Sequence, residues 1–215
     1  MIKYSKLFIV LIAFSSCSGL PLYDYGYNTI KESFLKLDTV VVDEAYMRSS
    51  KYAFIRVRFG SSRSAILTLV REQNDVLEWI SADDIHIFTF HGKIIKTLGL
   101  ANDIEVLNYH KPSFNNIHKK NFSYLVNFYE PILLEQVAAS YYIKKGLKEI
   151  KSPIEGRDKI KTNLYEERIY IQSINWTRKN KYYVNKNNQI EKTVQYIHPF
   201  LNPVTIEYIK KYKGN

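Results

Sequence analysis

From Thr39 onward, hydrophobic and polar residues alternate along much of the chain, which is the pattern of half-buried β-strands. In residues 52–59, four apolar side chains fall on one face and two arginines fall on the other. Many short strands separated by brief turns predict an all-β, antiparallel fold, either barrel-like or built of two packed sheets. The same alternation recurs in residues 63–71, 85–90, 93–98, 104–106, 124–128, 182–184, 190–197 and 204–212.

Turn residues connect several of these predicted strands. His91-Gly92 separates residues 85–90 from 93–98, and glycine supplies the positive φ that a two-residue hairpin turn requires. A second hairpin turn is predicted at residues 185–188. Residues 108–121 are predicted to form the longest loop. Residues 131–150 fit a helix and a strand equally well, so the pattern leaves both open there.

The segment that precedes the strands carries a helix signal. Thr29 and Glu32 have the spacing of a capping box, and Ile30, Phe34 and Leu37 follow at near-helical intervals. One short N-terminal helix is therefore expected. No repeat or second boundary interrupts the chain after it, so residues 29–215 are predicted to form a single β-rich domain.

The first 16 residues have the organisation of a signal peptide. Lysines precede a short apolar run, residues 7–14, and two serines lead to Cys17. The run is too short to span a bilayer, which takes roughly 20 apolar residues. The arrangement resembles a bacterial lipobox, in which the cysteine thiol takes a diacylglyceryl group and becomes the mature N-terminus. We therefore expect residues 1–16 to be removed, Cys17 to carry fatty acyl chains such as palmitate, and residues 17–28 to form a lipidated tether.

Two other interpretations of the N-terminus remain open. The first is an ordinary secretory signal that is cut near Ser16 and leaves a free thiol. The second is a buried N-terminal strand of a cytosolic protein. Ser18, rather than aspartate, follows the cysteine, which in lipoproteins of this kind points to the outer membrane. The expected location is therefore the outer membrane, lipid-anchored, on its periplasmic side.

Composition narrows the possible partners. Hydrophobic residues make up 46% and charged residues 24% of the chain, which is ordinary for a domain with a real core. The single cysteine excludes a disulfide framework and a cysteine-based zinc site. The net charge of +10 suits an acidic partner, such as anionic lipid headgroups or an acidic polysaccharide, and an exported protein rarely meets nucleic acid. The simplest interpretation is a lysine-rich surface without a dedicated partner.

No catalytic motif stands out, and no cofactor or metal site is predicted. Asp83 and Asp84 are adjacent, so in a strand their side chains point to opposite faces, and Glu166-Glu167 meets the same objection. Asp84 and His86 share one face, where a hydrogen bond between them is expected and a catalytic or metal role is the rarer case. His110 and His118 lie in the predicted loop and are weak evidence for a metal.

Basic residues are interleaved with aromatic residues in the second half of the chain. This arrangement fits a groove for an acidic glycan, because aromatic faces stack on sugar rings and lysines bind carboxylates. It fits equally a solvated basic face over a tyrosine-rich core, and that simpler interpretation is preferred. The residues concerned are Lys144, Lys145, Lys148, Lys151, Arg157, Lys159, Lys161, Arg178, Lys179 and Lys181, with Tyr141, Tyr142, Trp176, Tyr182 and Tyr183.

Two neighbouring segments resemble a known family. Residues 79–84 (Trp-Ile-Ser-Ala-Asp-Asp) and 89–100 (Thr-Phe-His-Gly-Lys-Ile-Ile-Lys-Thr-Leu-Gly-Leu) closely resemble the core motif of the YjbF/GfcB family, the lipoproteins of group 4 capsule and related exopolysaccharide operons. Residues 54–69, 163–176, 183–190 and 203–206 resemble other parts of the same family. His91 stands where that family usually has asparagine, and the loop at 108–121 is longer than usual.

The resemblance implies a β-barrel-like lipoprotein on the periplasmic face of the outer membrane. Its implied role is a non-enzymatic accessory one in exopolysaccharide or group 4 capsule production or export, beside other operon products that include a large outer-membrane β-barrel protein. The family carries no established catalytic residues.

Two other functions stay open. The C-terminal hairpin and strand resemble the open barrels of the LolA/LolB carriers, which suggests a carrier or binder of lipid or lipid-linked glycan. A glycan-modifying enzyme that uses Asp83, Asp84 and His86 is the other alternative.

Overall fold

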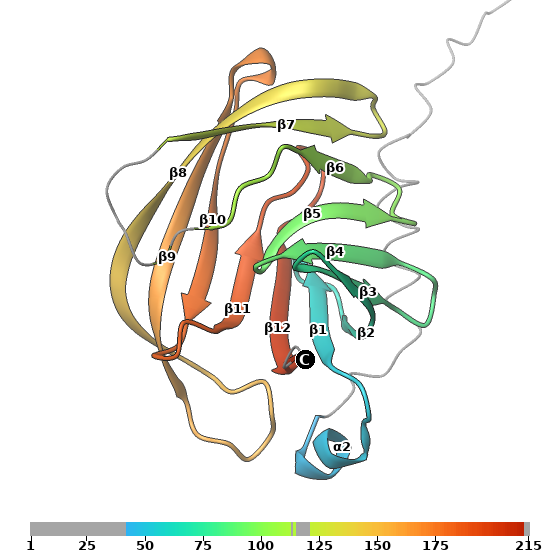
Figure 1. Cartoon of the computed structure of the whole chain (residues 1–215), viewed down its shortest axis with the longest axis vertical. Coiled ribbons are helices and arrows are strands. Elements are labelled where there is room, and N and C mark those ends of the chain that lie inside the picture. Colours follow the sequence, from blue (N-terminus) through green and yellow to red (C-terminus); the bar gives the residue numbers. More distant parts are fainter. Residues whose placement is uncertain (1–41, 113, 115–120, 213–215) are drawn as a thin grey trace, which may run out of the picture.

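In the computed structural model, which describes residues 42–112, 114 and 121–212, every strand pairs with its neighbours in sequence and the first pairs with the last (Figure 1). The described chain is therefore a closed, antiparallel, up-and-down barrel, which confirms the all-β expectation. Its strands are β1 (Phe54–Phe59), β2 (Ser64–Gln73), β3 (Val76–Ile80), β4 (His86–Phe90), β5 (Lys93–Leu98), β6 (Ile104–Leu107), β7 (Phe122–Phe128), β8 (Leu133–Ile150), β9 (Ile160–Ile171), β10 (Trp176–Val184), β11 (Ile190–Gln195) and β12 (Val204–Lys210).

Two short helical segments accompany the strands. Helix α2 (Glu44–Ser49) lies before β1, and a 3₁₀ turn η1 (Gln172–Ile174) joins β9 to β10. Asp43 caps α2, since its carboxylate accepts a hydrogen bond from the backbone N–H of Tyr46 at 2.8 Å. The helix expected from Thr29 falls outside the described residues.

The ambiguous segment 131–150 is a strand, β8, and it is the longest strand described. Ala138, Ser140 and Tyr142 are buried at every second position, which is the period of a strand and not that of a helix. The first half of β8 pairs with β7, and residues 138–150 pair with β9. A register shift beside Gly146, whose φ is +104°, bends the strand where the β7 pairing has ended.

The inward faces of the strands form one hydrophobic core. Trp79 lies fully buried in it, donates a hydrogen bond from its indole Nε1 to the Thr89 hydroxyl at 2.9 Å, and meets Tyr208 edge to face. The alternation predicted for 52–59 is confirmed, because Ile55, Val57 and Phe59 all belong to this core. The barrel is therefore filled by side chains along most of its length.

The seam that closes the barrel carries charged pairs on its outer wall. Glu207 of β12 binds Arg56 of β1 at 2.7 Å and Lys192 of β11 at 3.0 Å, so one carboxylate joins three strands. Burial raises the pKa of Glu207, but the two cations more than offset that effect and hold the pKa below its ordinary value. These pairs support the register in which the first and last strands meet.

A buried histidine makes the barrel sensitive to acid. His198 is 1% exposed, and burial lowers its pKa from 6.5 to about 4. The unfolded chain takes up this proton below about pH 6.5 while the folded chain does not, so stability is lost as pH falls from 6.5 towards 4. We expect the free energy of unfolding to be about 2 kcal/mol lower at pH 5 than at pH 7 on this account.

Guanidinium denaturation at the two pH values measures this loss. The matched variant is His198→Asn, whose amide oxygen can still accept the hydrogen bond that the Phe200 N–H donates to His198 Nδ1 at 3.1 Å. The variant should lose most of the pH dependence because asparagine does not titrate. An undiminished fall in stability between pH 7 and pH 5 in the variant would contradict the assignment.

Candidate binding site at one end of the barrel

A pocket of about 720 Å³ opens at the end of the barrel where β12 ends. Its walls come from β3, the β4–β5 turn, residues 111, 112 and 114, the β10–β11 turn and the end of β12, so segments from both halves of the chain contribute. This volume lies within the range of small-molecule sites, roughly 300–1,000 Å³. We call it the mouth pocket.

The β4–β5 turn forms one wall of the mouth pocket. His91 and Gly92 both have positive φ, +45° and +80°, as a two-residue type I′ hairpin turn requires, so the predicted hairpin is confirmed. A Cβ atom on Gly92 would lie 2.2 Å from Cδ1 of Ile190 on β11. Glycine is therefore needed both for its φ and for the close approach of this turn to β11.

A buried glutamine fixes that turn against β11. Gln195 accepts a hydrogen bond from the Ile94 N–H at 3.0 Å and donates one to the Gly92 carbonyl at 2.8 Å. Opposite it, Asn185 shapes the β10–β11 turn, because its side-chain oxygen accepts hydrogen bonds from two backbone N–H groups of the turn. Both walls are thus held by side chains that do not themselves line the pocket.

The charge at the rim of the mouth pocket is positive. Lys111 is exposed, and among the described residues no carboxylate lies within ion-pair distance of its ammonium group. Lys211 binds Glu191 at 2.5 Å, and His91 lies 3.3 Å from Asp75. Burial and the nearby Lys111 lower the pKa of His91 below its ordinary value of 6.5, so Lys111 carries the unneutralised charge at neutral pH.

The floor of the mouth pocket is closed. Trp79 and Tyr208 lie beneath it, and the only other cavity that we describe inside the barrel has a volume of about 20 Å³. Phe114 lines the pocket on one side and packs against Tyr165 and Tyr182 on the other, with ring centroids 5.0 and 5.6 Å away. The cavity of about 20 Å³ deeper in the barrel is too small for an acyl chain.

Behind Phe114 lies a buried ion pair. Lys93 of β5 donates to Glu167 of β9 at 2.6 Å, and both side chains are almost wholly inaccessible to solvent. Tyr182 and Asn180 of β10 donate to the second oxygen of Glu167 at 2.8 and 3.1 Å. The Lys93 ammonium also lies 3.8 Å from the centre of the Tyr124 ring.

This pair is charged in the folded protein. Burial by itself raises the pKa of Glu167, but the Lys93 ammonium and the hydrogen bonds from Tyr182 and Asn180 bring that pKa below its ordinary value. Burial likewise lowers the pKa of Lys93, but Glu167 and Tyr124 together bring that pKa above its ordinary value. With both Glu167 oxygens engaged and no access to solvent, the network is suited to holding the barrel together rather than to reacting with a substrate.

The residues that line the mouth pocket favour binding over catalysis. Hydrolysis of a glycosidic bond needs two carboxyl groups about 5–9.5 Å apart. No aspartate or glutamate is among the described residues that line the pocket, and the nearby Glu191 and Asp75 are occupied by Lys211 and His91. The pocket instead offers cations, the side-chain amides of Asn188 and Gln189, and apolar and aromatic surface.

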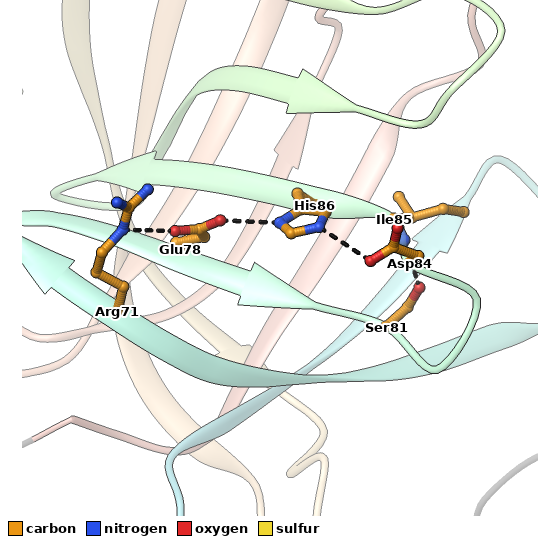
Figure 2. Close-up of polar contacts among 6 residues, drawn as sticks. All are labelled: Arg71, Glu78, Ser81, Asp84, Ile85 and His86. Atoms are coloured by element: carbon orange, nitrogen blue, oxygen red, sulfur yellow. Dashed lines mark hydrogen bonds and ion pairs between the residues drawn. The ribbon is translucent and has the colours of Figure 1, made fainter.

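The predicted contact between Asp84 and His86 exists, but it belongs to a chain of polar contacts on the outer wall. Figure 2 shows His86 between two carboxylates, with Nδ1 2.8 Å from Glu78 and Nε2 3.2 Å from Asp84. Arg71 donates to the other oxygen of Glu78 at 2.7 Å. Both ring nitrogens of His86 are therefore engaged, and His86 lines neither of the two cavities described above, so the group joins β2, β3 and β4 as a structural feature.

The other candidate residues are spread apart. Asp83 is exposed in the turn before β4. Glu166 and Glu167 point to opposite faces of β9, as expected, with Glu167 fully buried. His110 contacts the ring of Phe122. Cys17 and His118 lie outside the described residues, so their predicted roles stay predictions.

The basic and aromatic residues of the second half do not form a groove. Tyr142, Trp176 and Tyr182 are buried, while Lys144 and Lys145 are exposed, which confirms a solvated basic face over a tyrosine-rich core. In the described part of the chain, no three histidine, cysteine or acidic side chains gather as metal ligands would. Within the same residues, no helix has the length and apolar character that crossing a membrane requires.

Comparison with known proteins identifies the family. The sequence matches the YjbF family, described as group 4 capsule polysaccharide lipoprotein GfcB, YjbF, over residues 27–209. The fold is similar to that of the hypothetical lipoprotein YmcC from Escherichia coli K12 in its crystal structure. The TM-score is 0.70 at 16% sequence identity, over 88% of this chain and 97% of that one, a likeness that shows the fold alone. No curated protein matches the sequence. The resemblance of the motif between Trp79 and Leu100 is thus confirmed, and the chain belongs to the YjbF family of group 4 capsule polysaccharide lipoproteins.

Proposed function

We propose that this protein is a non-enzymatic accessory component of exopolysaccharide or group 4 capsule production or export, anchored by lipid to the periplasmic side of the outer membrane. The observation that carries the proposal is the family match over residues 27–209, which spans the whole barrel. The lipobox-like sequence before Cys17 supports the anchor. The partners proposed are the other proteins of such an operon at the outer membrane, among them a large β-barrel protein.

The geometry supports an accessory role over an enzymatic one. The mouth pocket has no carboxylate in its described lining, and the buried Lys93–Glu167 pair has no access to a substrate. The residues proposed for a glycan-modifying enzyme, Asp84 and His86, lie on the outer wall and complete a structural network. An accessory protein needs a stable body with a binding surface, and the barrel provides both.

One observation, the mouth pocket, favours a second function, which is the binding of lipid or lipid-linked glycan. The LolA/LolB-like form of this idea requires an apolar interior that takes up acyl chains. The interior described here is filled by side chains, with a cavity of only about 20 Å³. A binder that holds its ligand at the mouth is therefore the form that the geometry supports.

Deletion of the gene tests the main proposal. We expect the deletion strain to lose most of its surface polysaccharide while the rest of the operon is still expressed, and a plasmid copy of the wild-type gene to restore it. Cys17→Ala should fail to restore the polysaccharide and should not take up radioactive palmitate. Ser18→Ala should restore the polysaccharide and take up palmitate, since it leaves the acylated thiol in place. Unchanged polysaccharide in the deletion strain would refute the proposal.

A further inference from the structure

We propose that the mouth pocket binds an acidic sugar of a polysaccharide chain, with Lys111 as the cation that recognises the sugar carboxylate. This inference rests on the proposed function and deepens it by naming the class of ligand. It depends on three features of the pocket: an unneutralised charge, a mixed polar and apolar lining, and a closed floor.

The charge at the pocket selects for an anion. Lys211 is already paired with Glu191, and His91 lies beside Asp75, so Lys111 is the rim cation whose charge is left over among the described residues. An unpaired cation thus coincides with a cavity at this pocket. A ligand carboxylate there gains a charge-assisted contact without displacing an existing ion pair.

The rest of the lining suits a sugar. Asn188 and Gln189 are exposed at the β10–β11 turn and present amide donors and acceptors, which match sugar hydroxyls. Phe114 and Tyr212 add aromatic surface at the same opening, and Tyr212 is 41% exposed. Aromatic rings of this kind provide apolar faces for the C–H groups of a sugar ring, and the amides satisfy its polar edge.

The closed floor argues against an acyl chain as the ligand. Trp79 is fully buried beneath the pocket, and the cavity deeper in the barrel is about 20 Å³. A long chain would have to lie in the open pocket beside exposed amides and an ammonium group, so part of its apolar surface would stay in contact with water. A short stretch of acidic polysaccharide keeps its hydroxyls hydrated and does not need an enclosed tunnel.

The test uses the full lipidated chain in nanodiscs of phosphatidylcholine, titrated by isothermal calorimetry with three probes. Trigalacturonic acid carries the carboxylates on sugars, maltotriose is a neutral sugar of equal length, and octanoate carries a carboxylate on an apolar chain. We expect trigalacturonic acid to bind about tenfold more tightly than the other two. Lys111→Gln should weaken that binding about fivefold at low salt, the loss of one solvent-exposed charge contact. Lys179→Gln, which removes an exposed charge from β10 away from the pocket, should leave the binding unchanged.

Several outcomes would overturn the inference. Equal weakening by Lys111→Gln and Lys179→Gln would show a diffuse charge effect and no site. Equal binding of maltotriose would remove the role of the carboxylate, and tighter binding of octanoate would make the pocket a lipid site. If deletion abolishes surface polysaccharide while the purified protein ignores trigalacturonic acid, the inference falls and the proposed function stands.

Discussion

Glu167→Gln should lower the free energy of unfolding by about 3–5 kcal/mol, because it leaves the Lys93 ammonium buried without its counter-charge. The glutamine fills nearly the same space, so the loss comes from electrostatics and not from a cavity. The Lys93 side chain on β5 is only 7% exposed, so water can do little to stabilise an unpaired ammonium group there. Guanidinium denaturation of the full chain, followed by circular dichroism, measures the change.

The neighbouring residue provides a matched control. Glu166→Gln makes the same chemical change one position away, but Glu166 points to the outer face of β9 and lies 3.9 Å from a partly exposed Lys145. We expect that variant to lose less than about 1 kcal/mol. Equal losses in the two variants would show that burial of the Lys93–Glu167 pair has no special energetic role.

A double variant separates the pair from its surroundings. Lys93→Met with Glu167→Leu removes both charges and keeps apolar volume in the core. The double variant should be more stable than either Lys93→Met or Glu167→Gln alone, because no unpaired buried charge remains. Tyr182 and Asn180 would still lose an acceptor, so some destabilisation is expected to persist.

Strands that bury mainly one face were predictable from the alternation of their residues. In β1, apolar residues alternate with polar ones, and the apolar ones are Ile55, Val57 and Phe59. A strand in the wall of a filled barrel points every second side chain into the interior, so it requires the same period of two. The His91-Gly92 turn was predictable for a local reason, since its φ angles belong to the turn itself. The β2–β3 hairpin was missed, although Asn74 and Asp75 have positive φ there, because these residues also suit an ordinary loop.

Features that depend on distant segments were not predictable. The hydrophobic pattern of residues 131–150 fits a helix and a strand alike. This segment forms the strand β8 because it pairs with β7 on one side and β9 on the other. Glu167 gives no sign of burial in the sequence, because its partner Lys93 lies on β5, far away along the chain. The mouth pocket has the same origin, since its walls meet only after the barrel closes and brings Gly92 against Ile190.

For the second half of the chain, the sequence favours a basic face over a tyrosine-rich core and does not favour a binding groove. In β10, Lys179 and Lys181 alternate with the buried Asn180 and Tyr182, and alternation in a strand sends neighbouring side chains to opposite faces. In β8, Tyr142 is buried while Lys144 and Lys145 remain exposed. A binding groove would need cations and exposed rings on one surface, and the mouth pocket brings Lys111 and Tyr212 together at one opening.

Trp79→Ala should cost about 3–5 kcal/mol of the free energy of unfolding, because it removes a large, fully buried side chain from the centre of the core. It also leaves the Thr89 hydroxyl without the indole N–H that now lies 2.9 Å away. Since Trp79 lies beneath the mouth pocket, the cavity created would open the pocket towards the barrel interior. Thermal or guanidinium denaturation of the full chain measures the loss.

Two comparisons assign that loss to its causes. Trp79→Phe keeps an aromatic ring and removes the hydrogen bond, so it should cost only about 1–2 kcal/mol. Tyr52→Ala removes an aromatic side chain that is 64% exposed, and its effect should stay within about 0.5 kcal/mol. If Trp79→Ala were no worse than Tyr52→Ala, the core could not depend on the indole. If Trp79→Phe were as damaging as Trp79→Ala, the hydrogen bond to Thr89 rather than packing would be the main contribution of this residue.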